Sequence, residues 1–293
     1  MKVLCFDIGG TNVKYGVIKN GEILEKSMFP TNYKSGHKDV TDRLIITAKK
    51  IQKKHPDIQG VGISCAGSIN YDKGCMITPP DAIPQFGEWD FTKLFMDELG
   101  LPIVADNDVN SFAACECNMG AGAKYSTYIV MTVGTGIGGA IVVNNKIWRG
   151  NDYNAGEIGR MLVDGVHWEK MASMTALLKS AKLRGLEVEE GKDVFDLYDQ
   201  GNHVAQLVVS EFYQQLGKGI ANLVYIFNPE AIIIGGGISA RPDFGQEINA
   251  YADYYLVDGF QDTLDIIPAQ FRNDGGILGA YCNFVERYGK GNE

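Results

Sequence analysis

The fold is decided at residues 7–12, which read Asp7-Ile8-Gly9-Gly10-Thr11-Asn12. Apolar runs at residues 3–6 and 13–18 flank this stretch, and they predict two buried strands joined by a tight turn. Glycines in such a turn let backbone N–H groups approach an anion closely, and the Thr11 hydroxyl group adds a donor. Asp7, at the strand end, could hold Mg²⁺ through water. Taken alone, this turn could also be an ordinary hairpin with no bound anion. It is not a Walker loop, because no Gly-Lys-Ser/Thr follows it.

A second turn of the same kind lies at residues 134–139, Gly134-Thr135-Gly136-Ile137-Gly138-Gly139. It follows an apolar run at residues 128–133 and leads into another at residues 139–143. The turn matches Gly-x-Gly-x-x-Gly only in part, and no helix is expected after it, so dinucleotide binding is not indicated. Two such turns indicate an approximate internal duplication of the chain, with a boundary near residue 115.

The composition excludes several classes of partner. The chain has 293 residues, enough for two domains, with the hydrophobic (45%) and charged (22%) content of globular proteins. Its net charge is −9 and no Lys/Arg block stands out, so we expect a small-molecule ligand and neither nucleic acid nor a membrane surface. Residues 2–6 are too short for a signal-peptide core, and residues 129–143 fall short of a membrane span. Six cysteines, most of them in apolar runs, are typical of reduced buried thiols and predict a cytoplasmic protein.

A candidate catalytic carboxylate lies in Asp106-Asn107-Asp108, between a predicted strand at residues 102–105 and a predicted helix from Val109 onward. Reactive groups gather at the carboxyl ends of strands in α/β folds. A carboxylate there can accept a hydroxyl proton, and the Asn amide can bind a substrate hydroxyl group as donor and acceptor. Helix capping is the alternative, because Asp and Asn are preferred caps.

A glycine triplet follows a predicted buried strand at residues 231–234, Gly235-Gly236-Gly237. Glycines at this place indicate close approach of the backbone to a ligand or to another element, and the two glycine turns favour a nucleotide. Glu157 and Glu169 carry little signal alone, because a lone Glu is usually solvated. Cys115 and Cys117 fall on different faces of a predicted helix and the histidines lack ligand spacing, so a metal site is not indicated.

Periodicity predicts the elements around these motifs. Helices are expected at residues 40–55, 168–182 and 203–227 and after Asp274. Further strands are expected at residues 22–28, 60–64 and 264–271.

Together the motifs resemble the ROK sugar kinases, a family that groups repressors, open reading frames and kinases. The order of the motifs is that of the family along essentially the whole chain: 7–12, 107–108, 134–139, Gly156-Glu157-Ile158-Gly159, 235–237 and Asn273-Asp274-Gly275-Gly276. The resemblance implies an α/β, actin-like (ribonuclease-H-like) fold of two lobes, with ATP and sugar in the cleft between them. The lobes would be residues 1–115, completed by the C-terminal helix 275–293, and residues 116–274.

The resemblance also implies roles for individual residues. Asp108 would be the general base for the sugar hydroxyl group, in an ATP-dependent phosphorylation of a primary hydroxyl such as the 6-position. The ring hydroxyls would be held by Asn107, Glu157 and Glu169, with Gly67 and Ser68 meeting the sugar. ATP would be bound by Asp7, Gly9, Gly10, Thr11 and Asn12, by Gly134, Thr135 and Gly136, and by Gly235, Gly236 and Gly237. Mg²⁺ accompanies ATP, and Lys14 is expected to be a solvated surface residue.

The chain departs from the family pattern beside Glu157. The family has His three residues after this Glu and then a Cys-rich zinc loop, whereas here Arg160 stands at that position and only Gly165-Val166-His167 separates Asp164 from Trp168. We therefore expect no structural zinc, and the chain is most similar to the subgroup that includes β-glucoside kinases.

Other activities stay open at this point. N-acetylmannosamine kinase is the alternative sugar specificity, with residues 68–86 shaping the pocket. A non-catalytic sugar sensor of the same fold and an actin-like assembly ATPase are alternatives of other classes. The helix-turn-helix domain of the repressor branch has no room before the first strand, and the family implies a homodimer.

Overall fold

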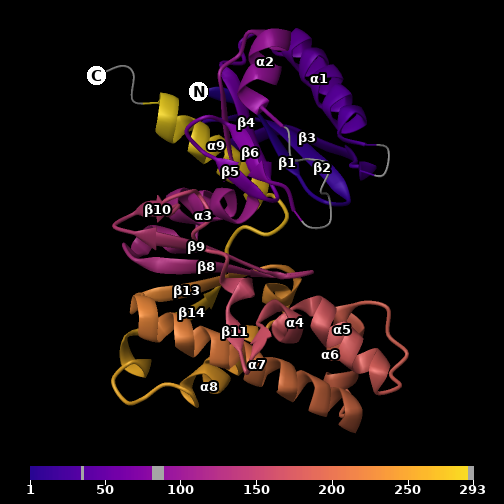
Figure 1. Cartoon of the computed structure of the whole chain (residues 1–293), viewed down its shortest axis with the longest axis vertical. Helices are drawn as coiled ribbons and strands as arrows, with labels where there is room; N and C mark the ends of the chain where they lie inside the picture. The colour runs from indigo at the N-terminus through magenta and orange to yellow at the C-terminus, as the bar shows by residue number, and fades with distance from the viewer. Residues whose placement is uncertain (34–35, 81–88, 290–293) are drawn as a thin grey trace. The chain divides into compact units, whose positions relative to one another are not determined.

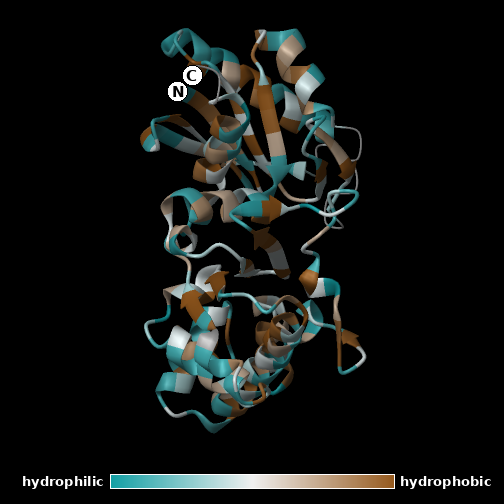
Figure 2. Ribbon diagram, turned by 90° about the vertical axis from the view of Figure 1, so that its left-hand side faces the viewer, coloured by the Kyte–Doolittle hydropathy of each residue, from teal (hydrophilic) through white to brown (hydrophobic). Residues whose placement is uncertain are grey.

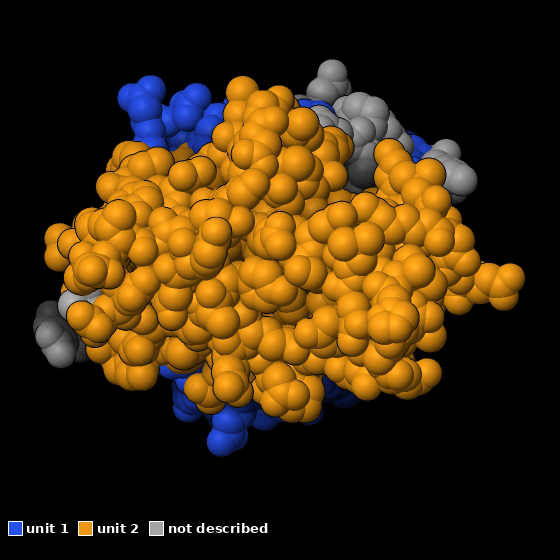
Figure 3. Space-filling model, turned by 90° about the horizontal axis from the view of Figure 1, so that it is seen from below, with its two compact units in different colours: residues 1–120, 149–154, 273–293 blue, residues 121–148, 155–272 orange. Residues whose placement is uncertain are grey.

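The computed structural model describes residues 1–33, 36–80 and 89–289. Residues 81–86 of the segment expected to shape the sugar pocket, and the last four residues of the expected segment 275–293, lie outside the described residues. The chain divides into two compact units, shown in two colours in Figure 3. Unit 1 comprises residues 1–120, 149–154 and 273–293, and unit 2 comprises residues 121–148 and 155–272.

Unit 1 contains a five-stranded sheet in the order β3-β2-β1-β4-β7 (Figure 1). Its strands are β1 (Lys2–Ile8), β2 (Asn12–Lys19), β3 (Glu22–Pro30), β4 (Gly60–Cys65) and β7 (Ile103–Asn107). The first three pair antiparallel, whereas β4 runs parallel to β1 and β7 runs parallel to β4. All six residues of β4 are buried, as expected for a parallel strand that is covered on both faces.

Helices cover the sheet of unit 1, and a short ribbon adjoins it. The helices are α1 (His37–Lys54), α2 (Phe91–Leu99), α3 (Asp108–Met119) and α9 (Gly275–Tyr288), and the ribbon is β5 (Ser68–Asn70) with β6 (Cys75–Thr78). The C-terminal helix α9 packs closely on β4 and on α3, because Gly62 faces the Ala280 carbonyl group and Gly279 faces the Ser111 carbonyl group with no room for a Cβ atom. Helix α9 is therefore part of the core of unit 1.

Unit 2 repeats this arrangement with a sheet in the order β10-β9-β8-β13-β14. Its strands are β8 (Tyr128–Val133), β9 (Ile137–Val143), β10 (Lys146–Trp148), β13 (Ala231–Gly235) and β14 (Asp265–Pro268). Here too the first three strands in sequence pair antiparallel and the last two are parallel. The two sheets thus share one topology, in agreement with the expected internal duplication.

The helices of unit 2 pack around a hydrophobic core of their own. They are α4 (Glu169–Ala172), α5 (Met174–Leu183), α6 (Gly191–Asp199), α7 (His203–Phe227) and α8 (Phe244–Asp253), and a small hairpin consists of β11 (Leu162–Val163) and β12 (Val166–His167). Figure 2 shows hydrophilic and hydrophobic residues mixed along the helical part of unit 2, as expected when one face of a helix is buried. Among the described residues, none of the helices combines the length and apolar character needed to cross a bilayer.

Two expected elements differ in the structure. The helix expected at residues 168–182 is interrupted at Ser173, which lies between α4 and α5. The Ser173 hydroxyl group accepts a hydrogen bond from the Ala176 N–H (3.2 Å) and so begins a new helix. The strand expected at residues 264–271 is only Asp265–Pro268, because its pairing with β13 ends at Pro268, which lies opposite Ile234.

Candidate active site

The turn that carries Asp108 joins β7 to α3. Asn107 is the N-cap of α3: its Oδ1 accepts hydrogen bonds from the N–H groups of Val109 (2.9 Å) and Asn110 (3.1 Å). Its Nδ2 donates to the carbonyl oxygen of Gly67 (3.0 Å). The capping alternative is therefore correct for Asn107, and the same side chain brings the predicted residues Gly67 and Asn107 together.

Asp108 is the first residue of α3 and is half-buried. Its Oδ1 accepts a hydrogen bond from the N–H of Val109 (3.0 Å). The amino end of a helix interacts favourably with negatively charged side chains in its first turn, which is where Asp108 lies. Asp108 is thus a carboxylate on a rigid turn at the end of a parallel strand, where a hydroxyl group could be deprotonated.

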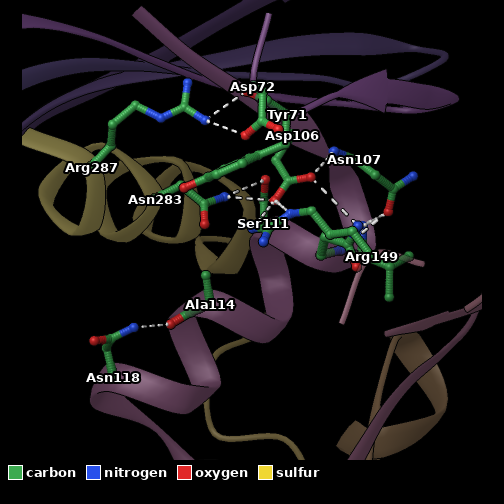
Figure 4. A network of polar contacts seen from close by, with 12 residues as sticks. Tyr71, Asp72, Asp106, Asn107, Ser111, Ala114, Asn118, Arg149, Asn283 and Arg287 are labelled. Atoms are coloured by element: carbon green, nitrogen blue, oxygen red, sulfur yellow. Dashed lines mark hydrogen bonds and ion pairs between the residues drawn. The ribbon is translucent and has the colours of Figure 1, made fainter. Parts of the chain in front are cut away.

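Asp106 precedes these residues and is buried, with 1% of its surface exposed. Its Oδ2 accepts hydrogen bonds from Nε (3.1 Å) and Nη2 (2.7 Å) of Arg149, and its Oδ1 accepts one from the N–H of Asn107 (2.9 Å). Figure 4 shows this cluster, which also includes Asn283 of α9. Burial raises the pKa of Asp106, and the Arg149 guanidinium group opposes that change. Arg149 was not among the predicted site residues, because nothing in the local sequence around it marks a long-range partner.

The first glycine turn places Asp7 at the end of β1, against the amino end of α9. A Cβ atom at Gly276 would lie 2.6 Å from both carboxylate oxygens of Asp7. The Ser64 hydroxyl group donates to Asp7 Oδ1 (2.8 Å), and Lys14 Nζ lies 3.8 Å from Oδ2. Burial raises the pKa of Asp7, while Ser64 and Lys14 lower it. Lys14 has 39% of its side chain exposed, as expected for a surface residue, and it also donates to the Asn273 carbonyl oxygen (3.1 Å).

The turn itself is closed by its own backbone and is open to solvent at its tip. Gly9 N–H donates to the carbonyl oxygen of Asn12 (3.1 Å), and the Thr31 hydroxyl group donates to the Gly9 carbonyl oxygen (2.6 Å). Gly10 and Thr11 are exposed, and a Cβ atom at Gly10 would meet nothing within 4 Å. An anion can therefore approach this turn closely.

The second glycine turn lies next to Glu169. The carbonyl oxygen of Gly134 accepts a hydrogen bond from the N–H of Met174 (2.9 Å), and Gly136 faces the Glu169 carboxylate. Trp168, fully buried, donates through Nε1 to the carbonyl oxygen of Gln215 (2.8 Å) in α7 and so fixes the chain before Glu169. The structure thus brings Glu169 to the turn 134–136, which sequence spacing alone did not indicate.

Glu157 lies where the chain packs on β9. Gly156 faces the carbonyl oxygen of Gly139, and Gly159 faces that of Ile137, each without room for a Cβ atom. These two glycines hold the segment against the strand, while the Glu157 side chain is 53% exposed, with Arg160 Nε 3.7 Å from its Oε2. The glycines of this motif therefore have a packing role, and its carboxylate is presented to solvent.

The glycine triplet has two roles in unit 2. Gly236 has φ +95° and faces the Val133 carbonyl group, so it is required by the contact between β13 and β8. Gly237 faces open space and lines a cavity of about 530 Å³. The cavity is walled by Met174, by α6 and by the segment that follows β13. Its lining residues are Met174, Glu190, Gly191, Lys192, Phe195, Asp196, Asp199, Gly237, Ile238, Ala240, Arg241 and Pro242. A cavity of this size suits a nucleoside.

Residues 162–167, where the family has its zinc loop, form the hairpin β11–β12. Its turn is held by the ion pair between Lys218 of α7 and Asp164 (2.5 Å). In the part of the chain that the structure describes, no three His, Cys, Asp or Glu side chains are grouped so that they could hold a metal ion.

Known proteins match this chain over nearly its whole length. The ROK family profile matches residues 3–286. A β-glucoside kinase from Klebsiella pneumoniae is 34% identical over 300 residues, covering 98% of this chain and 97% of that protein. A solved structure of a candidate N-acetylmannosamine kinase from Listeria monocytogenes is 31% identical with a TM-score of 0.86, covering 98% of this chain and 100% of that one. A ROK family glucokinase from Streptomyces griseus, in complex with glucose and AMPPNP, is 27% identical with a TM-score of 0.82, covering 96% and 98% of the two chains. These matches confirm the expected α/β, actin-like fold.

Proposed function

The chain belongs to the ROK family, and we propose that it is an ATP-dependent kinase that phosphorylates a primary hydroxyl group, the 6-hydroxyl of a hexose or β-glucoside. The expected class of enzyme, a carbohydrate kinase, agrees with the names of its relatives. The observation that carries the proposal is the placement of Asp108 at the amino end of α3, on a turn held by Asn107 and Asp106.

Asp108 acts as the general base. Its carboxylate accepts the proton of the attacking hydroxyl group while that oxygen bonds to the γ-phosphorus of ATP and the bond to the β,γ-bridging oxygen breaks. Phosphoryl transfer depends mainly on positioning and charge stabilisation, which one fixed carboxylate and glycine-rich backbone donors provide. A protein that only binds sugar has no need of a base here, so the non-catalytic sensor is disfavoured.

The glycine turns bind the phosphates of ATP, which enters with Mg²⁺ as part of the substrate. The residues are Asp7, Gly9, Gly10, Thr11 and Asn12 in unit 1 and Gly134, Thr135 and Gly136 in unit 2. The exposed backbone at Gly10 and Thr11 supports this assignment, because it leaves N–H groups open to an anion. Asp7 contacts the hydrated Mg²⁺ through water, and Lys14 beside it adds a positive charge.

The cavity beside Gly237 holds the nucleoside. Its lining combines apolar side chains such as Phe195 and Ile238 with the carboxylates of Glu190 and Asp196, which can accept hydrogen bonds from ribose hydroxyls or an exocyclic amine. Gly235 ends β13 and Gly236 follows it, so both come directly before Gly237, which lines the cavity and leaves its space open.

Five residues bind the sugar hydroxyls in this proposal. Asn107, Gly67 and Ser68 belong to unit 1, whereas Glu157 and Glu169 belong to unit 2. Asn107 Oδ1 is engaged by the amino end of α3, so Asn107 serves the sugar as a donor through Nδ2, which has two N–H groups. Arg160, which stands where the family has His, lies next to Glu157, with its Nε 3.7 Å from Oε2 of that residue.

The sugar is a β-glucoside or glucose in our proposal, supported by the hairpin in place of the zinc loop and by the β-glucoside kinase relatives. N-acetylmannosamine is the second candidate, favoured by the similarity to the Listeria structure. ADP release from Mg²⁺-ATP should be measured with glucose, cellobiose and other β-glucosides, N-acetylmannosamine, N-acetylglucosamine, fructose and mannose. β-Glucosides or glucose should turn over well above the rest, whereas binding without turnover for every sugar would favour the sensor.

Three further features stay predictions. A cytoplasmic location is supported by the six free cysteines, four of which are buried. The expectation of a homodimer rests on the family resemblance alone, and sedimentation tests this expectation. The absence of structural zinc is tested by elemental analysis, in which one zinc per chain would contradict our interpretation of the 162–167 hairpin.

A further inference from the structure

Residues 149–154, which we call the strap, belong to unit 1 although the residues on either side of them in sequence belong to unit 2. Three side chains anchor the strap to unit 1. Arg149 pairs with Asp106 (2.7 Å), the Tyr153 hydroxyl group donates to Asp72 Oδ2 (2.6 Å), and Asn154 bonds to the hydroxyl group of Ser68. The strap therefore contacts the same part of unit 1 that carries Ser68 and the turn before α3.

Arg149 is held firmly in place. Its guanidinium carbon lies 3.7 Å from the centroid of the Tyr71 ring, and that of Arg287 lies 4.2 Å from the same centroid. Arg287 in turn donates to the Tyr71 carbonyl oxygen (2.8 Å). Burial raises the pKa of Tyr71 to about 12, so its ring is neutral and can stack on both cations. Figure 4 shows these side chains around Asp106.

The link from Arg149 to the catalytic turn runs through Asp106. Oδ2 of Asp106 takes both hydrogen bonds from Arg149, while Oδ1 accepts the backbone N–H of Asn107 (2.9 Å). A carboxylate with 1% exposure needs a compensating cation, and without one it moves, becomes protonated or draws in water. Each of these changes alters the bond to Asn107 and thereby the turn that presents Asp108.

We propose that Arg149 is a positioning residue for sugar phosphorylation: by clamping Asp106 it fixes the turn that carries Asn107 and Asp108. The inference rests on the proposed function of Asp108. In the sequence the strap is followed closely by Gly156 and Glu157. Its contacts with unit 1 therefore also hold the chain just before Glu157, which is another of the proposed sugar-binding residues. Arg149 itself does not touch the reacting atoms.

Four variants separate positioning from a plain contribution to stability. Arg149→Met removes both hydrogen bonds to Asp106. Arg149→Lys keeps the positive charge but loses the planar guanidinium group that donates them. Arg149→Met with Asp106→Asn removes the clamp without leaving a buried unpaired charge, so it keeps the test valid if the single variant folds poorly. Arg287→Met is the matched control, because Arg287 also stacks on Tyr71 but binds Asp72 and the Tyr71 carbonyl group and not Asp106.

The measurements are kcat, the KM values for sugar and ATP, sugar binding by calorimetry and urea unfolding. Arg149→Met should lower kcat/KM for the best sugar about 100-fold, with KM for ATP changed less than about twofold. Arg149→Lys should recover part of the loss, the double variant should stay impaired, and Arg287→Met should stay within about threefold of the unaltered chain.

Either of two results would overturn the inference. One is a sugar kcat/KM for Arg149→Met that equals that of Arg287→Met. The other is recovery of normal sugar kinetics in the double variant, which would make the unpaired charge the whole effect. If the unaltered chain turns over no sugar, the proposed function fails instead, and calorimetry still tests whether loss of Arg149 weakens sugar binding.

Discussion

The carboxylate of Glu169 lies against the backbone of Gly136, where a Cβ atom would be 2.6 Å from Oε2 of Glu169. A Cβ atom at Gly136 would therefore take the space that the Glu169 carboxylate fills, and we assign Glu169 to sugar binding. Gly136 has an ordinary negative φ, so alanine is compatible with its backbone and the substitution acts through Glu169.

Gly136→Ala should therefore displace Glu169 and raise KM for the sugar about tenfold, since a misplaced ligand loses its hydrogen-bond geometry. Glu169→Gln should give a change of similar size and direction. Gly245→Ala, where the added Cβ atom makes only ordinary contacts, serves as the control and should leave KM unchanged. Steady-state kinetics with varied sugar checks this, and equal KM values for Gly136→Ala and Gly245→Ala would refute the assignment of Glu169.

Asp108→Asn removes the general base while keeping the shape of the side chain. We expect kcat to fall about 1,000-fold, with sugar affinity by calorimetry within about threefold of the unaltered chain. Asp42→Asn is the matched control, because Asp42 forms an exposed pair with Lys38 on α1. A kcat near normal for Asp108→Asn would show that another group accepts the proton.

Arg241 lies in the segment after β13 and joins that wall of the cavity to the α6 wall and to the neighbouring helix α8. Its guanidinium group binds both carboxylate oxygens of Asp199 in α6 (2.8 Å each) and both of Glu247 in α8 (2.7 and 2.8 Å). Arg241→Met should raise KM for ATP about tenfold with little effect on KM for the sugar, because the α6 wall is released. It should also lower the free energy of unfolding by about 2 kcal/mol.

Arg184→Met is the control for this change. Arg184 pairs with Glu211 near the surface, where such pairs contribute about 0–1 kcal/mol. Kinetics with varied ATP and urea unfolding measure both effects. A KM for ATP that is the same in the two variants would contradict the placement of the nucleoside in this cavity.

Asp7 predicts a pH dependence of stability. Burial raises its pKa in the folded chain above the ordinary value of about 3.9, although Ser64 and Lys14 act the other way. The folded chain therefore binds this proton more tightly than the unfolded chain, so the group favours folding below about pH 4 and that contribution is lost as the pH rises through the folded pKa.

Asp7→Asn removes this titration. The free energy of unfolding of the variant, relative to the unaltered chain, should rise as the pH is raised from about 3.5 through the pKa of Asp7 in the folded chain. Urea unfolding at several pH values measures the difference, with Asp42→Asn as the reference. A relative stability that falls over the same range would mean that Lys14 and Ser64 outweigh burial at Asp7.

Local sequence patterns were sufficient to predict several helices, strands and turns of the fold. Helix α7 spans His203–Phe227 as its apolar period predicted, and both glycine turns lie between antiparallel strands. Asn107 caps α3, as the preference of Asn for that position allowed. These features depend on residues close in sequence, where periodicity and turn chemistry carry the information.

Long-range relationships were not accessible in the same way. Arg149 meets Asp106 across 43 positions and shares Tyr71 with Arg287, and no local rule links these residues. The break at Ser173 was missed because apolar residues continue through it with helical spacing, whereas the chain must bend there for Met174 to reach Gly134. The cavity to which we assign the nucleoside likewise depends on α6 lying against the segment after β13.

The central claim is the transfer of the γ-phosphate of ATP to a primary hydroxyl group of a β-glucoside with Asp108 as the base. The most direct test is incubation of the protein with Mg²⁺-ATP and cellobiose, followed by identification of the product by NMR. We predict ADP and a disaccharide phosphorylated on a 6-hydroxyl group in equal amounts, and no product with Asp108→Asn. Phosphate on a ring hydroxyl, or ADP formed without any sugar phosphate for every sugar of the panel, would contradict the account.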